Sequence, residues 1–110
     1  MDDAQRSLQA GRLITENTGD TIADGLRMHL SEATWRIISA NVADILTVSE
    51  AEIVAAMRLI WARMKIVIEP SSAVPVAAIL KNSATFTGRR VGVIVTGGNV
   101  DLDRPPWIGA

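Results

Sequence analysis

Cysteine is absent from this chain of 110 residues, and a single histidine is present. The absence of cysteine excludes disulfide bonds, thiolate catalysis and cysteine-ligated zinc, and it is compatible with a reducing cytoplasm. Aromatic residues make up only 4% of the chain, and basic residues do not interleave with them. Because 11 basic residues nearly balance 12 acidic ones, the chain has no excess of positive charge that would favour binding to nucleic acid or to an anionic membrane.

The chain also lacks an apolar run long enough to cross a bilayer, and acids stand near its start where a secretory signal would be apolar. We therefore expect a cytoplasmic protein that binds neither nucleic acid nor membrane. A chain of this length can form one small domain. Because no internal repeat or second domain is visible, we expect residues 1–110 to form part of a single domain.

Helical patterns occupy much of what is present. The best signal is Ser49 with Glu52 three positions later, a capping box followed by apolar residues at helical spacing. Gly11 is placed to close a short first helix, and Ser71 or Ser72 to cap a later one. We expect helices over residues 2–9, 24–30, 31 onward, 49–65 and 71–80, with a polar connector over 81–90.

Three apolar segments, 44–48, 66–68 and 91–95, have the pattern of strands. The last of them breaks directly into Thr96, Gly97, Gly98 and Asn99. The glycines permit backbone torsions closed to other residues, and ligands of open α/β sheets bind just past strand ends. Thr96 and Asn99 could therefore present a hydroxyl and a carboxamide to a ligand. An ordinary strand-to-loop turn is the alternative.

This turn, read with the segments 21–26 and 65–71, resembles one family over residues 2 to about 102. The family is that of the pyridoxal-phosphate enzymes of the tryptophan synthase β fold type, in the branch of serine/threonine dehydratases, serine racemases and hydroxyaspartate ammonia-lyases. The resemblance implies an α/β fold, a partial three-layer sandwich of parallel strands flanked by helices. It implies pyridoxal 5'-phosphate as cofactor, with magnesium or calcium as a candidate ion.

By this resemblance, Thr96 matches a serine whose hydroxyl hydrogen-bonds the pyridine nitrogen of the cofactor, and Gly97 lies beside it in the cofactor site. A neutral hydroxyl does not hold that nitrogen protonated, which suits β-elimination better than transamination. Threonine keeps the oxygen but adds a methyl group and a stiffer χ1. The alternative is a hydroxyl that only bonds the backbone of its own turn.

Other site residues are implied in the same way. Gly25 matches a glycine beside the cofactor ring, with a helix-start glycine as the alternative, and Glu69 matches an acid near the cofactor face. The alternative for Glu69 is to cap the helix that follows it. For Asp24 a helix cap is favoured. His29 matches no catalytic position, so a surface or partly buried histidine is expected.

Two further matches concern effectors. Lys65 and Asn99 match positions that contact nucleotide in serine racemases. Asp3 matches an aspartate that helps to hold a divalent cation in that branch, while Met1 stands in place of an alanine that offers its carbonyl. Because one carboxylate cannot form a site of six oxygens, Asp3 is at most half of a metal site.

The chemistry of the family also requires a Schiff-base lysine and a glycine-rich phosphate loop. The chain has two lysines, Lys65 and Lys81, neither in a Ser-Phe-Lys signature, and no cluster of three glycines. We therefore expect the C-terminal part of an enzyme: a fragment, a truncated gene product or one part of a split protein.

The intact enzyme, with the N-terminal remainder, would be a homo-oligomeric ammonia-lyase that turns a small 3-hydroxy amino acid into a 2-oxo acid and ammonia. The 110-residue chain by itself would be inactive. The alternatives are a racemase like serine racemase and a noncatalytic α/β regulatory or dimerisation module.

Overall fold

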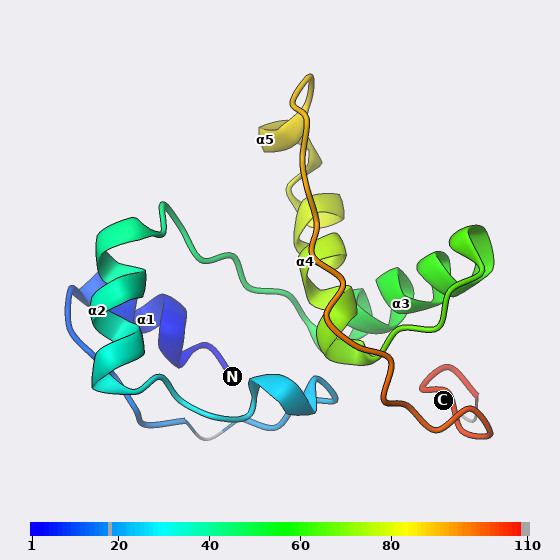
Figure 1. Ribbon diagram of the computed structural model, residues 1–110, viewed down its shortest axis with the longest axis horizontal. Helices are drawn as coiled ribbons and strands as arrows, with labels where there is room; N and C mark the ends of the chain where they lie inside the picture. Colours follow the sequence, from blue (N-terminus) through cyan, green and yellow to red (C-terminus); the bar gives the residue numbers. More distant parts are fainter. Residues whose placement is uncertain (18, 109–110) are drawn as a thin grey trace. The chain divides into compact units, whose positions relative to one another are not determined.

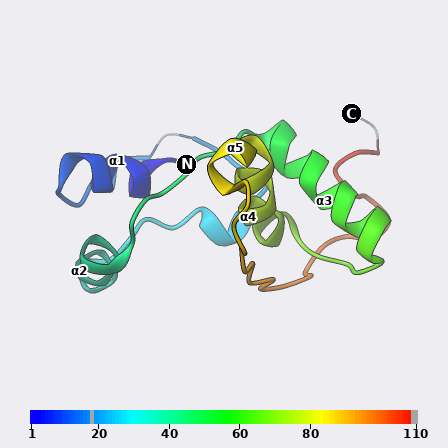
Figure 2. The ribbon, with the colours of Figure 1, turned by 90° about the horizontal axis from the view of Figure 1, so that it is seen from above.

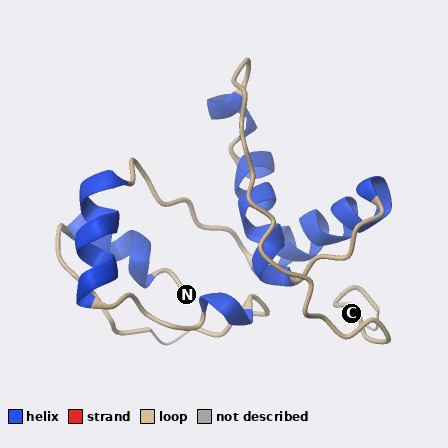
Figure 3. Cartoon of the chain, viewed as in Figure 1, coloured by secondary structure: helices blue, strands red, loops and turns tan. Residues whose placement is uncertain are grey.

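The computed structural model describes residues 1–17 and 19–108, and every regular element in this part of the chain is a helix (Figures 1 and 3). The chain divides into two compact units. The N-terminal unit comprises Met1–Thr21 and Gly25–Thr47, and the C-terminal unit comprises Ile22–Asp24 and Val48–Ala110. The elements are α1 (Asp3–Ala10), the 3-10 helix η1 (Asp24–Leu26), α2 (Glu32–Asn41), α3 (Glu50–Met64), α4 (Pro70–Lys81) and α5 (Ser83–Phe86).

In the N-terminal unit, the predicted close of the first helix at Gly11 and the predicted start of a helix at residue 31 are confirmed. Gly11 closes α1 in the left-handed conformation, with φ of 65°. The hydroxyl of Ser31 accepts a hydrogen bond from the backbone N–H of Thr34 at 3.2 Å and so caps α2. The helix expected over residues 24–30 is shorter than predicted, because only the 3-10 turn η1 forms there.

The core of the C-terminal unit lies where α3 and α4 pack against each other, as Figure 2 shows from above. The capping box of α3 is confirmed, since Ser49 and Glu52 each accept a hydrogen bond from the other's backbone N–H. α3 ends at Met64, and its C-cap Lys65 takes the left-handed conformation with φ of 59°. Eight buried residues form this core: Ala23, Ile53, Ala56, Met57, Ile60, Ile68, Ala73 and Ala77.

The start of α4 differs from the prediction. Neither Ser71 nor Ser72 is its N-cap; Glu69 takes that position without a side-chain capping bond, and Pro70 follows at the first helical turn. Proline suits this place because the amide it lacks would have no partner within the helix. Ser72 is thereby drawn inside the first turn of α4, where only 1% of its surface is exposed.

The predicted strands over 44–48, 66–68 and 91–95 are wrong for this structure, because all three segments lack regular secondary structure. A strand exists only through a ladder of hydrogen bonds to a neighbouring strand, and the described residues pair none of these segments in that way. Ile94 is accordingly 80% exposed. The polar connector over 81–90 holds a short helix, α5, that the sequence did not predict. No helix in the described ranges is long and apolar enough to cross a membrane.

Candidate functional site

The polar turn, defined here as Thr96, Gly97, Gly98 and Asn99, is fastened to the beginning of α4. One anchor is the buried hydroxyl of Ser72. Its Oγ accepts hydrogen bonds from the backbone N–H groups of Thr96 at 3.1 Å and Gly97 at 2.8 Å. The same oxygen lies 3.0 Å from the Gly97 carbonyl oxygen and 3.0 Å from Thr96 Oγ1. The turn is thus held by a side chain from a different element, 24 residues earlier.

Glu69 supplies the second anchor. Its backbone N–H donates to the carbonyl of Gly97 at 3.0 Å, and its carboxylate oxygen Oε2 accepts from the backbone N–H of Asn99 at 2.9 Å. Because the side chain makes no capping bond to α4, the carboxylate serves the turn and not the helix end. Glu69, Thr96 and Gly97, which the resemblance assigned to the cofactor site, are therefore brought together in one cluster with Asn99, which it assigned to a nucleotide contact.

The two glycines of the turn are required for close packing. A Cβ on Gly97 would lie 2.9 Å from Glu69 Oε2, and one on Gly98 would lie 2.8 Å from the backbone oxygen of Val67. Neither glycine uses a positive φ; in the described ranges only Gly11 and Gly88 do so among glycines. The expectation that these positions need glycine for its unusual backbone torsions is therefore wrong. They need glycine because residues 67–69 pack too closely against the turn to leave room for a Cβ.

The segment that leads to Glu69 is held by Trp61 of α3. The indole Nε1 donates to the carbonyl of Ile68 at 2.9 Å, and Ile68 itself is 1% exposed. Trp107 packs edge-on against Trp61, with ring centroids 5.0 Å apart and an interplanar angle of 90°. An extended segment is thus fixed in place without a sheet, because a side chain satisfies its carbonyl group.

Ser72 is the residue of this cluster whose role sequence reasoning missed, since it was considered only as a helix cap. Its neighbours on α4 offered one signal. Ala73 and Ala77 are small and buried, which marks a helix face that another segment approaches closely. A hydroxyl on such a face needs a partner, and the turn at residues 96–97 supplies it.

The remaining predicted site residues lie outside this cluster. Gly25 is in η1 and belongs to the N-terminal unit. Lys65 ends α3 and is exposed. Asp3 begins α1, is 5% exposed, and its Oδ1 accepts a hydrogen bond from Asn17 Nδ2 at 2.7 Å. No group of three or more histidine, aspartate or glutamate side chains that could hold a metal occurs in residues 1–17 and 19–108. His29 is exposed, as the surface interpretation expected.

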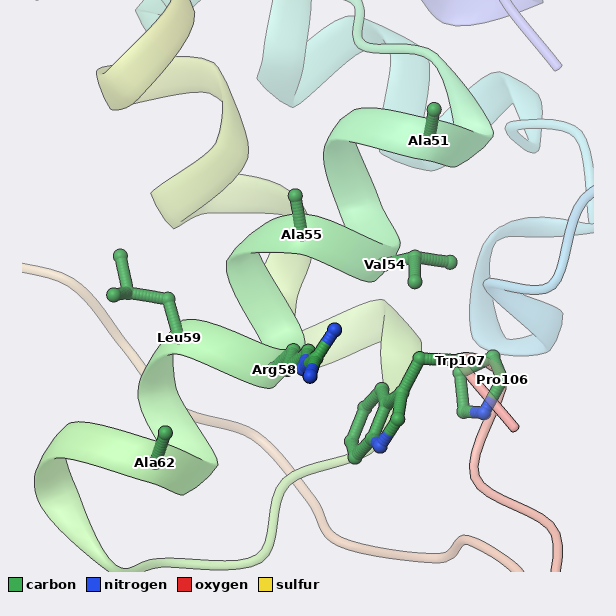
Figure 4. Close-up of a pocket in the computed structure, with 8 residues that line it drawn as sticks. All are labelled: Ala51, Val54, Ala55, Arg58, Leu59, Ala62, Pro106 and Trp107. Carbon is green, nitrogen blue, oxygen red and sulfur yellow. The ribbon is translucent and has the colours of Figure 1, made fainter. Parts of the chain in front are cut away.

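A separate groove of about 680 Å³ lies along α3 (Figure 4). Its only charged lining residue is Arg58, and Pro106 and Trp107 of the C-terminal segment border it. None of its lining residues belongs to the cluster around the polar turn. Because its walls offer neither a nucleophile nor an acid, the polar turn remains the candidate site. The lining residues are Ala51, Val54, Ala55, Arg58, Leu59, Ala62, Pro106 and Trp107.

The chain is similar to known proteins over most of its length. Beta-hydroxyaspartate dehydratase of Paracoccus denitrificans is 58% identical over 106 residues, which cover 96% of this chain and 34% of that protein. L-threo-3-hydroxyaspartate ammonia-lyase of a Pseudomonas species is 50% identical, over 93% of this chain and 32% of that protein. The crystal structure of serine racemase from Dictyostelium discoideum superposes with a TM-score of 0.82 at 48% identity, covering 92% of this chain and 33% of that one.

These matches confirm the resemblance inferred from the three segments. The chain spans about a third of the length of the relatives it matches. Its fold is that of the corresponding part of the tryptophan synthase β-like enzymes, although the described residues show the helices of that fold and not its sheet. Residues 1–97 match the family model described as pyridoxal-phosphate dependent enzyme, and this chain belongs to that family.

Proposed function

We propose that this chain forms one wall of the cofactor site in an ammonia-lyase that converts a 3-hydroxy amino acid into a 2-oxo acid and ammonia. One observation carries the proposal. The backbone of the polar turn is tied to α4 through Ser72 and Glu69, while Thr96 itself is exposed. A rigid turn that presents one exposed hydroxyl is suited to hold a single acceptor atom of a ligand.

The donor set fits pyridoxal phosphate at its ring nitrogen. That nitrogen, when unprotonated, accepts one hydrogen bond, and the Thr96 hydroxyl can donate one. The nearby Glu69 carboxylate accepts the backbone N–H of Asn99. The group offered to the ring nitrogen is therefore the Thr96 hydroxyl and not this carboxylate. When bound, the pyridoxal ring withdraws electrons from the α-carbon of the amino acid. A hydroxyl donor on the protein leaves the ring nitrogen unprotonated, so the ring withdraws electrons only moderately. Moderate withdrawal favours loss of the substrate's β-hydroxyl over transamination.

The other residues of the cluster shape this wall. Gly97 and Gly98 let the turn lie against residues 67–69, and Glu69 holds the turn at both its carbonyl and its amide. Each contact restricts the position of Thr96. Precise placement of one hydroxyl is a requirement of the site, because misplacement by about 1 Å can cost two orders of magnitude in rate.

The lysine that moves the α-proton is expected elsewhere in the enzyme. Lys81 is paired with Glu52 at 3.2 Å, and Lys65 ends α3; neither belongs to the cluster. We propose that the Schiff-base lysine and the phosphate loop lie in the two-thirds of the relatives that this chain does not match. The overall change removes the α-proton and the β-hydroxyl as water, and a second water releases ammonia.

The remaining assignments extend the same proposal. Gly25 would lie beside the cofactor ring, Lys65 and Asn99 would contact a nucleotide, and Asp3 would give one ligand to magnesium or calcium. The intact enzyme would be homo-oligomeric and cytoplasmic. Because the described residues hold no group of three or more histidine, aspartate or glutamate side chains that could bind a metal, further carboxylate ligands would have to come from outside them.

The substrate proposed is 3-hydroxyaspartate, because two relatives at 58% and 50% identity are named for it. A racemase is the second candidate, favoured by the superposition on serine racemase at 48% identity. The two reactions share the abstraction of the α-proton and differ in whether the β-hydroxyl leaves.

The test is a chimera in which this chain replaces the corresponding third of the Paracoccus dehydratase, with the unaltered dehydratase as control. We expect the chimera to bind pyridoxal phosphate and to release ammonia from 3-hydroxyaspartate. Conversion of L-serine into D-serine without ammonia release would establish the racemase instead. A folded chimera that does not bind pyridoxal phosphate would contradict both enzymes and favour the noncatalytic module.

A further inference from the structure

We propose that Ser72 is a positioning residue: its buried hydroxyl donates to Thr96 Oγ1 and thereby makes Thr96 a donor toward an unprotonated ring nitrogen. This inference rests on the proposed function and adds the group that sets the direction of the Thr96 hydrogen bond. Ser72 is 1% exposed, so it does not itself face a ligand. It would act only through Thr96.

The acceptor capacity of Ser72 is already filled. A serine hydroxyl has two lone pairs and one proton. The backbone N–H groups of Thr96 and Gly97, at 3.1 and 2.8 Å, occupy the two lone pairs. Ser72 therefore has no lone pair left for the proton of the Thr96 hydroxyl. The 3.0 Å contact between the two side-chain oxygens is then a hydrogen bond that Ser72 donates.

The single proton of Ser72 has two acceptors in reach, both at 3.0 Å: the carbonyl of Gly97 and Thr96 Oγ1. The Gly97 carbonyl already accepts the backbone N–H of Glu69 at 3.0 Å. Thr96 Oγ1 meets no other polar partner in the described residues. Because a carbonyl oxygen has two lone pairs, Ser72 can also donate to Gly97, so its proton is shared between the Gly97 carbonyl and Thr96 Oγ1.

The Thr96 proton is left to point away from α4. Since Thr96 is exposed, this proton is available to a ligand. A hydroxyl that donates pairs with an unprotonated pyridine nitrogen, whereas a protonated nitrogen would need an acceptor. The stiff χ1 of threonine limits the other positions that the hydroxyl could take. Ser72 would therefore set the position of the hydroxyl and leave its proton available to an unprotonated ring nitrogen.

The experiment is a double-mutant cycle in the chimera, with Ser72→Ala, Thr96→Val and the double variant, and Ser83→Ala on α5 as a matched control. Affinity for pyridoxal phosphate and the 15N signal of labelled cofactor at its ring nitrogen are measured. We expect Thr96→Val to weaken affinity at least about tenfold in the parent but about threefold or less when Ser72 is alanine, because the hydroxyl is then no longer directed. The 15N signal should shift in Ser72→Ala, and Ser72→Thr should restore it.

The outcomes separate the two proposals. If Thr96→Val leaves cofactor affinity unchanged, the proposed function fails. If Thr96→Val weakens binding equally in both backgrounds and Ser72→Ala leaves the 15N signal unchanged, Ser72 only supports the turn and this inference is wrong. Should Ser72→Ala fail to fold, Ser72→Cys takes its place in the cycle, since a thiol is a weak donor and should give an intermediate 15N shift.

Discussion

At the scale of single residues, hydroxyl groups and glycines define the candidate site more than charged groups do. Ser72 reaches four polar atoms of the turn from a buried position, and Glu69 adds two contacts from the residue before α4. Buried polar groups of this kind must be satisfied, and here each one is satisfied by the turn. The position of Thr96 is therefore a consequence of packing at α4.

Thr96 is the residue whose substitution tests the cofactor contact. In the chimera, Thr96→Val nearly preserves the shape but removes the donor, which leaves a buried acceptor of the cofactor unpaired at a cost of roughly 1–3 kcal/mol. Affinity for pyridoxal phosphate or turnover should fall by about one to two orders of magnitude. Thr96→Ser should be mild because the donor survives. Equal behaviour of parent, valine and serine variants would show that Thr96 is only a turn residue.

The glycines of the turn should differ in their tolerance of a methyl group. Gly98→Ala should lower the free energy of unfolding by roughly 1–3 kcal/mol, because its Cβ would meet the backbone of Val67 at 2.8 Å. Gly97→Ala should cost less, since the carboxylate of Glu69 can move aside. Gly92→Ala is the matched control, with nothing within 4 Å of its Cβ. Denaturant unfolding of the three variants measures the order, and an equal effect at Gly92 and Gly98 would contradict it.

At the scale of elements, α3 is the best-defined helix because its two ends are fixed by different means. Its start has the complete capping box of Ser49 and Glu52. Glu50 adds a contact by accepting the backbone N–H of Ile22 at 2.9 Å, which ties the segment Ile22–Asp24 to the same unit. Near its end, Trp61 binds the carbonyl of Ile68. α3 thus positions both the segment before Glu69 and the core under α4.

The capping box makes the stability of α3 depend on pH. The backbone N–H of Ser49 lowers the pKa of Glu52 below its ordinary value, with the side chains of Lys81 and Ser49 acting in the same direction. Because the pKa is lower in the folded state, this stabilisation is present above the unfolded pKa and is lost as the pH falls through the folded pKa. The melting temperature of the chimera should therefore fall in that acidic range, and Glu52→Gln should flatten the profile. An unchanged profile in the glutamine variant would assign the acid sensitivity to other carboxylates.

At the scale of the whole molecule, the chain leaves much apolar surface exposed. Ile94 is 80% exposed, Val95 47% and Val91 43%, all in the segment predicted to be a buried strand. Such residues are ordinarily covered by neighbouring strands and helices. The relatives, which are about three times as long, have more chain with which to cover them.

The exposed segment over residues 91–95 should cause the isolated chain to self-associate. Ile94→Lys should reduce this association, because a charge on an exposed extended segment opposes pairing between chains. Ile37→Lys on α2, at a position 66% exposed, is the control and should have a smaller effect. Sedimentation over a range of concentrations measures the association. A monodisperse monomer that melts cooperatively would show that the 110 residues are self-sufficient.

The isolated chain should also be inactive. Neither of its two lysines belongs to the cluster at the polar turn, so no amine is placed there to move an α-proton. Incubation of the purified chain with pyridoxal phosphate and serine, threonine or 3-hydroxyaspartate should yield no 2-oxo acid. Formation of pyruvate or 2-oxobutyrate by clean protein would overturn this expectation.

Local signals in the sequence were sufficient for the family and for most helix boundaries. The helix caps act on backbone groups within a few residues, so the sequence predicts them without knowledge of the fold. These caps are Gly11, Ser31, and Ser49 with Glu52. The segments 21–26, 65–71 and 96–99 were likewise enough to indicate the pyridoxal-phosphate enzymes, which the match over residues 1–97 confirms. These features depend on residue type and spacing alone.

Only the tertiary structure decided which distant residues meet and which apolar segments remain unpaired. Ser72 and Thr96 are 24 residues apart, and no short-range pattern links a serine inside a helix to a turn after an extended segment. The same limit explains the strands that did not form, because a β-branched run becomes a strand only when another chain segment completes its hydrogen bonds. Sequence by itself determined the family, the helices α1, α2 and α3, and the caps at Gly11, Ser31 and Ser49. Long-range contacts determined the anchors of the polar turn, because they depend on how α3 and α4 pack.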